Sequence, residues 1–111
     1  SRGKIDMAFI AMHGKFGEDG QIQMILKDLN IAYTGSGPTA SLNAMDKIAA
    51  KNIFMKNDIS TPSFFVLGPK APKPSSMKFP KVIKPSFSGS SIGVFVVREC
   101  NNFSNALSRA L

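Results

Sequence analysis

The clearest chemical signal in this sequence is a glycine- and serine-rich segment between two apolar runs, at residues 84–94. Lys84 ends the first run, and Ser86, Gly89 and Ser91 lie in the segment that follows. Such a loop between two strands can align backbone N–H groups and a cation along a polyphosphate. A plain hairpin turn favours the same residue types. The segment matches neither a Walker A loop nor a dinucleotide-binding glycine turn, so neither site is predicted.

A second lysine, Lys47, stands one place after Asp46, a residue type that caps helices. A cation in the first turn opposes the helix dipole, so helix stability does not explain Lys47. The ordinary alternative is an exposed surface lysine. Two lysines from separate segments that converge on one anion would neutralise phosphate charge. The pairing with Lys84 therefore predicts that both lysines contact phosphate.

His13 ends the continuous apolar run at residues 7–12, which predicts a strand buried on both faces, and it opens a glycine-rich segment. In open α/β sheets, ligands bind beyond the carboxyl ends of the strands. There a histidine can donate a hydrogen bond to a carboxylate or to a developing oxyanion, or it can simply end the strand. Glu18 and Asp19 are expected to organise the loop and favour the start of the next helix. No cluster of side chains has metal-ligand spacing, so no metal site is predicted.

The elements that must position these residues follow from periodicity. The first half is interpreted as an α/β unit with two further helices, the second of them capped by Asp46. The second half is interpreted as an antiparallel sheet, with a Pro- and Lys-rich connection at residues 68–80 and a last helix capped by Asn101. The expected strands are 7–12, 31–34, 63–67, 81–84 and 93–98, and the expected helices are 21–30, 38–45, the one after Asp46, and 103–111.

The composition indicates a globular protein of one domain's length, with 111 residues and 43% hydrophobic content. One cysteine excludes a disulfide within the chain, and the absence of a long apolar run predicts a soluble, cytoplasmic protein. The net charge is +7, and residues 59–98 contain no acid. A basic stretch of this kind can attract nucleic acid, a membrane surface or a phosphorylated small molecule. A small basic module that binds polyanions is therefore one alternative.

Four blocks, in this order along the chain, resemble the D-alanine–D-alanine ligase family of the ATP-grasp superfamily. As a set they are highly specific, and they span most of the chain. The blocks are His13-Gly14 with residues 17–20 and Gln23, residues 33–37, residues 45–47, and Lys84-Pro85 with residues 89–91 and Gly93.

The resemblance implies a reaction in which ATP drives the joining of two D-alanines through an acylphosphate. It implies that Lys47 and Lys84 hold the ATP phosphates, with the loop from Ser86 to Ser91, including Gly89, closing over them. It implies that Ser90 orients substrate through a hydrogen-bond network and that His13 lies beside the first D-alanine. Magnesium ligands, and a homodimer of the full-length enzyme, are implied outside what this chain supplies.

The resemblance also implies the fold class, which is α/β. Residues 1–45 would form the end of a Rossmann-like amino-terminal substrate domain, and residues 46–111 the first α+β part of an ATP-grasp domain. Both parts would be incomplete and would expose apolar faces. The chain alone is therefore expected not to catalyse the ligation. Ligases that make D-alanine–D-lactate or D-alanine–D-serine remain alternatives, and neither nucleic acid nor a membrane is expected as a partner.

Overall fold

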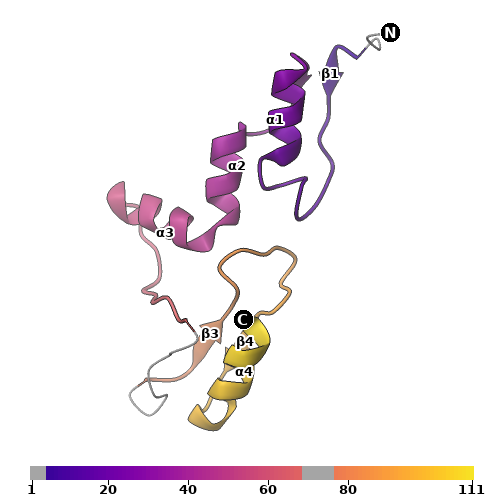
Figure 1. Cartoon of the computed structure of the whole chain (residues 1–111). Coiled ribbons are helices and arrows are strands. Elements are labelled where there is room, and N and C mark those ends of the chain that lie inside the picture. The colour runs from indigo at the N-terminus through magenta and orange to yellow at the C-terminus, as the bar shows by residue number, and fades with distance from the viewer. Residues whose placement is uncertain (1–4, 69–76) are drawn as a thin grey trace.

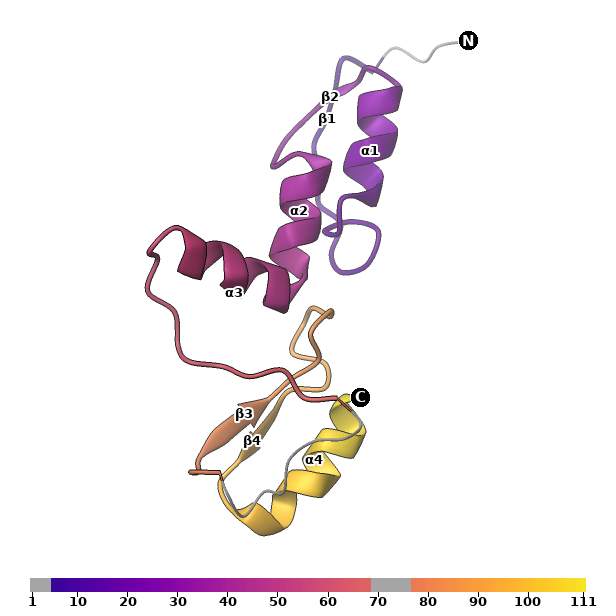
Figure 2. The same ribbon diagram turned by 60° about the vertical axis from the view of Figure 1, so that its left-hand side comes forward.

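The computed structural model describes residues 5–68 and 77–111 and shows an elongated molecule, 62 × 30 × 21 Å. Its radius of gyration is 18.2 Å, against about 13 Å for a compact chain of this length. Two parts lie one above the other and meet at a narrow junction (Figures 1 and 2). The fold is therefore best understood as two small units held together at that junction.

The amino-terminal unit holds two short parallel strands and three helices. Its elements are β1 (Met7–Ala8), α1 (Gln21–Asp28), β2 (Ala32–Tyr33), α2 (Pro38–Met45) and α3 (Lys47–Lys56). Met7 pairs with Ala32 and Ala8 with Tyr33, and α1 connects the two strands. The strand–helix–strand unit expected from the sequence is thus confirmed. Pro38 stands at the first position of α2, where its missing N–H costs nothing.

The carboxy-terminal unit is a hairpin covered by a helix. Its elements are β3 (Lys81–Ile83), β4 (Phe95–Val97), a 3₁₀ turn (Cys100–Asn102) and α4 (Phe103–Ala110). The strands pair antiparallel, and α4 packs against them. The buried core of this unit consists of Ile83, Val97, Phe103 and Ala106. The ring of Phe79 meets that of Phe103 edge-on, with centroids 6.4 Å apart.

Helix α1 begins where it does because of Asp19 and Gly20. The Asp19 carboxylate accepts hydrogen bonds from the backbone N–H of Phe16 at 3.0 Å and of Gln21 at 3.2 Å, and one from the Gln21 side chain at 2.7 Å. These bonds, above all that from Phe16, hold the pKa of Asp19 below its usual value. Gly20 is left-handed, with φ 93°, and a Cβ there would lie 2.4 Å from the Pro38 carbonyl oxygen. The expectation that Asp19 organises this loop is confirmed.

The strand expected at residues 7–12 is shorter and more exposed than predicted. Only Met7 and Ala8 pair as a strand, and Phe9 is 80% exposed. The strand pairing ends after Ala8. The Thr34 N–H donates to the Ala8 carbonyl, and the Ile10 N–H bonds to the Thr34 hydroxyl instead of to a backbone carbonyl. The expectation that this part of the chain exposes apolar side chains is confirmed, and that of a strand buried on both faces is wrong.

Residues 63–67 form no strand, contrary to expectation. Within the described residues they pair with no strand, and Lys51 holds residues 61 and 62 just before them. Its ammonium donates to the Thr61 hydroxyl at 2.8 Å and the Pro62 carbonyl at 2.7 Å, and lies 5.0 Å from the Phe64 ring centroid. Most of the 68–80 connection falls at residues 69–76, outside the described part of the chain.

Asn101 does not cap the last helix. It lies inside the 3₁₀ turn, and Asn102 occupies the cap position without a side-chain capping bond. The turn replaces the cap because its own backbone bond, from Asn102 N–H to the Glu99 carbonyl at 3.2 Å, leads the chain into the helix.

Two neighbouring valines on β4 test the core of the carboxy-terminal unit. Val97 is 1% exposed and Val96 is 61% exposed. We expect Val97→Ala to lower the free energy of unfolding by about 2 kcal/mol, because it removes two buried carbons and leaves a cavity. The matched Val96→Ala should stay within about 0.5 kcal/mol. Urea denaturation followed by circular dichroism measures both, and equal losses would contradict the assigned core.

The Asp19 hydrogen bonds predict a pH dependence. Since the folded-state pKa lies below the unfolded value of about 3.9, the carboxylate contributes stability above about pH 4, which is lost as the pH falls through the folded-state pKa. Asp19→Asn should mimic that loss at pH 7, because its amide group meets N–H donors. We expect faster amide exchange at residues 14–20, measured by mass spectrometry. Asp28→Asn, on an exposed carboxylate of the same unit, is the control that should change little.

Candidate functional site

The two units meet where α3 begins. The backbone N–H of Lys47 donates to the Ser86 carbonyl at 2.9 Å, and Asp46 and Phe87 form an isolated antiparallel bridge. The Lys47 ammonium donates to the Ser88 carbonyl at 2.7 Å. The start of α3 is therefore fixed to the glycine- and serine-rich segment, called here the 86–91 loop.

Asp46 sets the position of Lys47 from the helix side. Its carboxylate accepts hydrogen bonds from the N–H groups of Ile48 at 2.9 Å and Ala49 at 3.1 Å, so the predicted cap is confirmed. Lys47 is consequently the first residue of α3. A cation at this end of a helix receives no help from the helix dipole, so the loop carbonyl and Asp46 must hold it.

The charge of Lys47 is influenced by burial and by two charged residues. Burial lowers the pKa of the Lys47 ammonium, the charge of Lys84 lowers it further, and Asp46 opposes both. Lys84 itself is exposed and stands directly after β3. Lys84 also stands two residues before Ser86, whose carbonyl accepts the Lys47 N–H, so the two lysines belong to neighbouring segments. Two neighbouring ammonium groups repel, and an anion between them would relieve that repulsion.

The 86–91 loop has a strained backbone at its tip. Ser90 and Ser91 are both exposed and both left-handed, with φ 53° and 57°. Residues other than glycine rarely adopt this conformation, and strain of this kind often lies at ligand-binding sites. Gly93 has φ 72°, and a Cβ there would lie 2.8 Å from the Pro85 side chain, so this turn requires glycine. At Gly89 an added Cβ would meet nothing closer than 3.8 Å, so packing alone does not require glycine there.

The loop that follows His13 approaches the 86–91 loop. The Glu18 carboxylate accepts a hydrogen bond from the Gly14 N–H, and its Oε2 lies 3.8 Å from the position of a Cβ on Gly89. His13 is exposed at the start of this loop. Among the hydrogen bonds of the described residues, none joins His13 or Ser90 to the lysines. The structure therefore brings Lys47, Lys84 and the 86–91 loop together, and His13 lies on the neighbouring loop.

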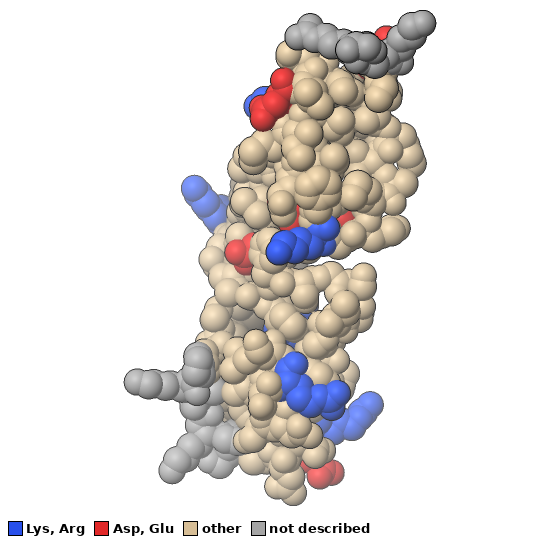
Figure 3. Space-filling view, turned by 45° about the vertical axis from the view of Figure 1, so that its right-hand side comes forward, with Lys and Arg blue, Asp and Glu red and all other residues tan. Residues whose placement is uncertain are grey.

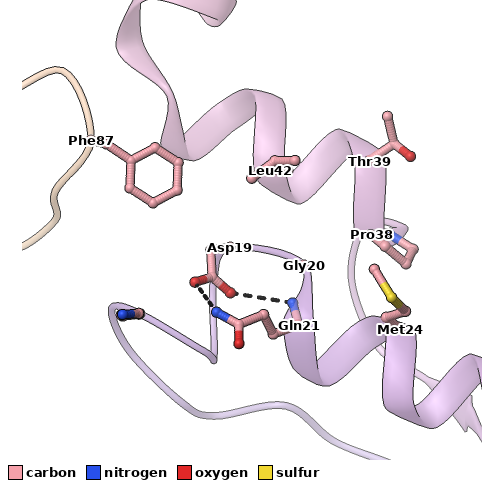
Figure 4. A pocket seen from close by; sticks show the side chains of 9 residues that line it. Asp19, Gly20, Gln21, Met24, Pro38, Thr39, Leu42 and Phe87 are labelled. Atoms are coloured by element: carbon pink, nitrogen blue, oxygen red, sulfur yellow. Dashed lines mark hydrogen bonds between the residues drawn. The ribbon is translucent and has the colours of Figure 1, made fainter.

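A cavity of about 330 Å³ lies beside this junction, between the amino-terminal ends of α1 and α2. Figure 4 shows the ring of Phe87 at one end, across from Leu42 on α2 and Asp19 below it. The remaining lining residues are Lys15, Gly20, Gln21, Met24, Pro38 and Thr39. The ring of Phe87 thus reaches toward the amino-terminal unit, while its backbone pairs with Asp46. On the face drawn in Figure 3, side chains of both charges lie near the level where the units meet.

Two contributors to this junction were not apparent in the sequence. The backbone of Asp46 pairs with Phe87, and Glu18 lies near Gly89. Contacts between residues so far apart along the chain leave no spacing signal. Only the hydrophobic side chain at position 87, inside an otherwise small and polar segment, marks Phe87 as unusual.

Among residues 5–68 and 77–111, no three His, Cys, Asp or Glu side chains gather as metal ligands would. In the same part of the chain, no helix is both long and apolar enough to cross a membrane.

Comparison with known proteins gives consistent matches. Residues 1–36 match the family model described as D-ala D-ala ligase N-terminus, and residues 65–111 match D-ala D-ala ligase C-terminus. The D-alanine–D-alanine ligase of Hydrogenovibrio crunogenus is 47% identical over 94 residues, which cover 82% of this chain and 30% of that protein. The chain thus spans about a third of the length of the curated relatives it matches.

Solved structures agree in fold. The D-alanine–D-alanine ligase from Helicobacter pylori matches with a TM-score of 0.82 and 31% identity, over 94% of this chain and 33% of that one. The VanG D-Ala:D-Ser ligase from Enterococcus faecalis matches with a TM-score of 0.79 and 30% identity, over 96% of this chain and 33% of that one. The predicted α/β fold class is confirmed. With the family models matching at both ends, the chain belongs to the D-alanine–D-alanine ligase family.

Proposed function

We propose that this chain is part of an enzyme that joins two D-alanines to D-alanyl-D-alanine at the expense of ATP, for the synthesis of peptidoglycan precursors. The observation that carries the proposal is that Lys47 binds to the 86–91 loop, which begins two residues after Lys84. The relatives at 40–47% identity are named D-alanine–D-alanine ligases, which supports ATP-dependent ligation of D-alanine over the binding of an unrelated polyanion.

The phosphate side of the proposed site consists of Lys47, Lys84 and the 86–91 loop. The two ammonium groups would neutralise charge on the ATP phosphates, since each is free to donate several hydrogen bonds. Lys47 spends one donor on the Ser88 carbonyl and keeps two. Backbone N–H groups between Ser86 and Ser91, including that of Gly89, would complete the phosphate-binding site. The cation pair and the strained tip of the loop fit a polyphosphate.

The amino-acid side of the proposed site involves His13 and Ser90. ATP would supply the phosphoryl group that activates one D-alanine carboxylate, and the amine of the second D-alanine would displace phosphate. His13 would lie beside the first D-alanine and donate a hydrogen bond to its carboxylate. The exposed Ser90 hydroxyl would orient substrate through a hydrogen-bond network.

The same proposal covers the domains of the enzyme, its location, its oligomeric state and its metal. Residues 1–45 would belong to the amino-terminal substrate domain and residues 46–111 to the ATP-grasp domain. The enzyme would be a cytoplasmic homodimer that uses Mg²⁺, with metal ligands supplied by parts of the enzyme other than this chain. This boundary at Asp46 follows the sequence blocks; in space, α3 stays packed against α2 in the amino-terminal unit.

Charge removal at the two lysines tests the phosphate side. We expect Lys47→Met and Lys84→Met each to weaken ATP binding to the 111-residue chain about tenfold or more, because each loses a charge-assisted hydrogen bond. Isothermal titration calorimetry measures the affinity. Lys27→Met, on the exposed side of α1, is the matched control and should leave affinity unchanged. Equal losses in all three variants would point to unspecific attraction by net charge.

A chimera tests the reaction itself. The matching segment of the H. crunogenus ligase is replaced by this chain, and phosphate release is measured with ATP, Mg²⁺ and D-alanine. We expect release that depends on D-alanine and is lost in the chimera with Lys84→Met, while the isolated chain releases none. A chimera that folds and binds ATP yet ligates D-alanine to D-serine or D-lactate in preference would contradict the proposed product. Phosphate release by the isolated chain would contradict the need for other segments.

A further inference from the structure

Asp46 joins three parts of the structure at one residue. Its backbone N–H donates to the Leu42 carbonyl at 3.1 Å, which closes the end of α2. Its carboxylate caps α3 through Ile48 and Ala49. Its backbone, extended at φ −81° and ψ 105°, pairs with Phe87 of the 86–91 loop. No other described residue has a role in all three places.

These contacts determine where Lys47 can reach. With the cap in place, the first turn of α3 holds Lys47 so that its N–H meets Ser86 and its ammonium meets Ser88. Without the cap, the N–H groups of Ile48 and Ala49 lose their acceptor, and the first turn frays. Lys47 would then lose its fixed relation to the loop while keeping its charge.

The carboxylate of Asp46 also acts on the charge of Lys47, while its hydrogen bonds go to the cap. Both of its recorded hydrogen bonds go to one oxygen, Oδ1, and come from backbone N–H groups. Its charge favours the ammonium form of Lys47, against burial and against Lys84. Asp46 can therefore act by geometry and by charge, and the two effects are separable by substitution.

We propose that Asp46 is a positioning residue, which fixes Lys47 and the 86–91 loop in the mutual arrangement that receives phosphate. The proposal rests on the proposed function only for the identity of the anion. The arrangement itself, the cap together with the backbone pairing, is independent of that function. Residue 46 would thus influence ATP binding without touching ATP.

Four variants of the full 111-residue chain separate the contributions. Asp46→Ala removes both the cap and the charge. Asp46→Asn and Asp46→Ser keep a capping oxygen but remove the charge. Ala50→Gly weakens α3 to a similar extent and leaves the cap intact. We expect Asp46→Ala to weaken ATP binding about fivefold, by calorimetry, and the other three to stay within about twofold. Amide exchange at Lys47 should be faster in Asp46→Ala alone, because its bond to Ser86 depends on the cap.

The outcomes decide between the possibilities. If Ala50→Gly weakens binding as much as Asp46→Ala, general helix stability explains the effect and the proposal is wrong. If Asp46→Asn weakens it as much, charge rather than position is responsible, and the proposal is again wrong. If the unaltered chain binds no ATP, the proposed function fails. Exchange at the Lys47 amide then still supports or overturns the positional role, because it requires no nucleotide.

Discussion

The hydrogen bond from the Lys47 ammonium to the Ser88 carbonyl, with the backbone bond from Lys47 to Ser86, is the constraint on which the site depends. It joins the amino-terminal unit to the carboxy-terminal unit across a narrow junction. An ammonium group has three donors and a carbonyl can accept one of them, so this contact leaves Lys47 able to bind an anion as well. The Lys47 side chain therefore both joins the two units and takes part in the proposed phosphate binding.

The rest of the fold can be understood as support for that contact. The buried cluster around Val97 and Phe103 anchors the hairpin whose strands carry the 86–91 loop. The turn at Asp19 and Gly20 sets the start of α1 against the start of α2, and α2 leads directly to Asp46. The apolar side chains that remain exposed agree with a chain that spans about a third of its relatives' length.

Local features of the sequence predicted local structure well, because their causes lie within a few residues. Pro38 and Asp46 correctly predicted the starts of α2 and α3, and the pattern of apolar residues predicted both units. Prediction failed where pairing between strands decides the structure: residues 63–67 have strand-forming side chains, yet in the described part of the chain they pair with no strand. The shared role of Lys47 and Lys84 stays a prediction, made from the family resemblance and the charge argument. The tether from Asp46 to Phe87 was not, because its two ends lie far apart in the sequence.

The central claim is that Lys47 and Lys84 act on the same anion. A double-mutant cycle with Lys47→Met, Lys84→Met and the combined variant, read out as ATP affinity, tests it most directly. We expect the two effects to be coupled, with an interaction free energy of at least about 0.5 kcal/mol. Effects that add to within about 0.3 kcal/mol would show that the lysines act independently and would contradict the claim.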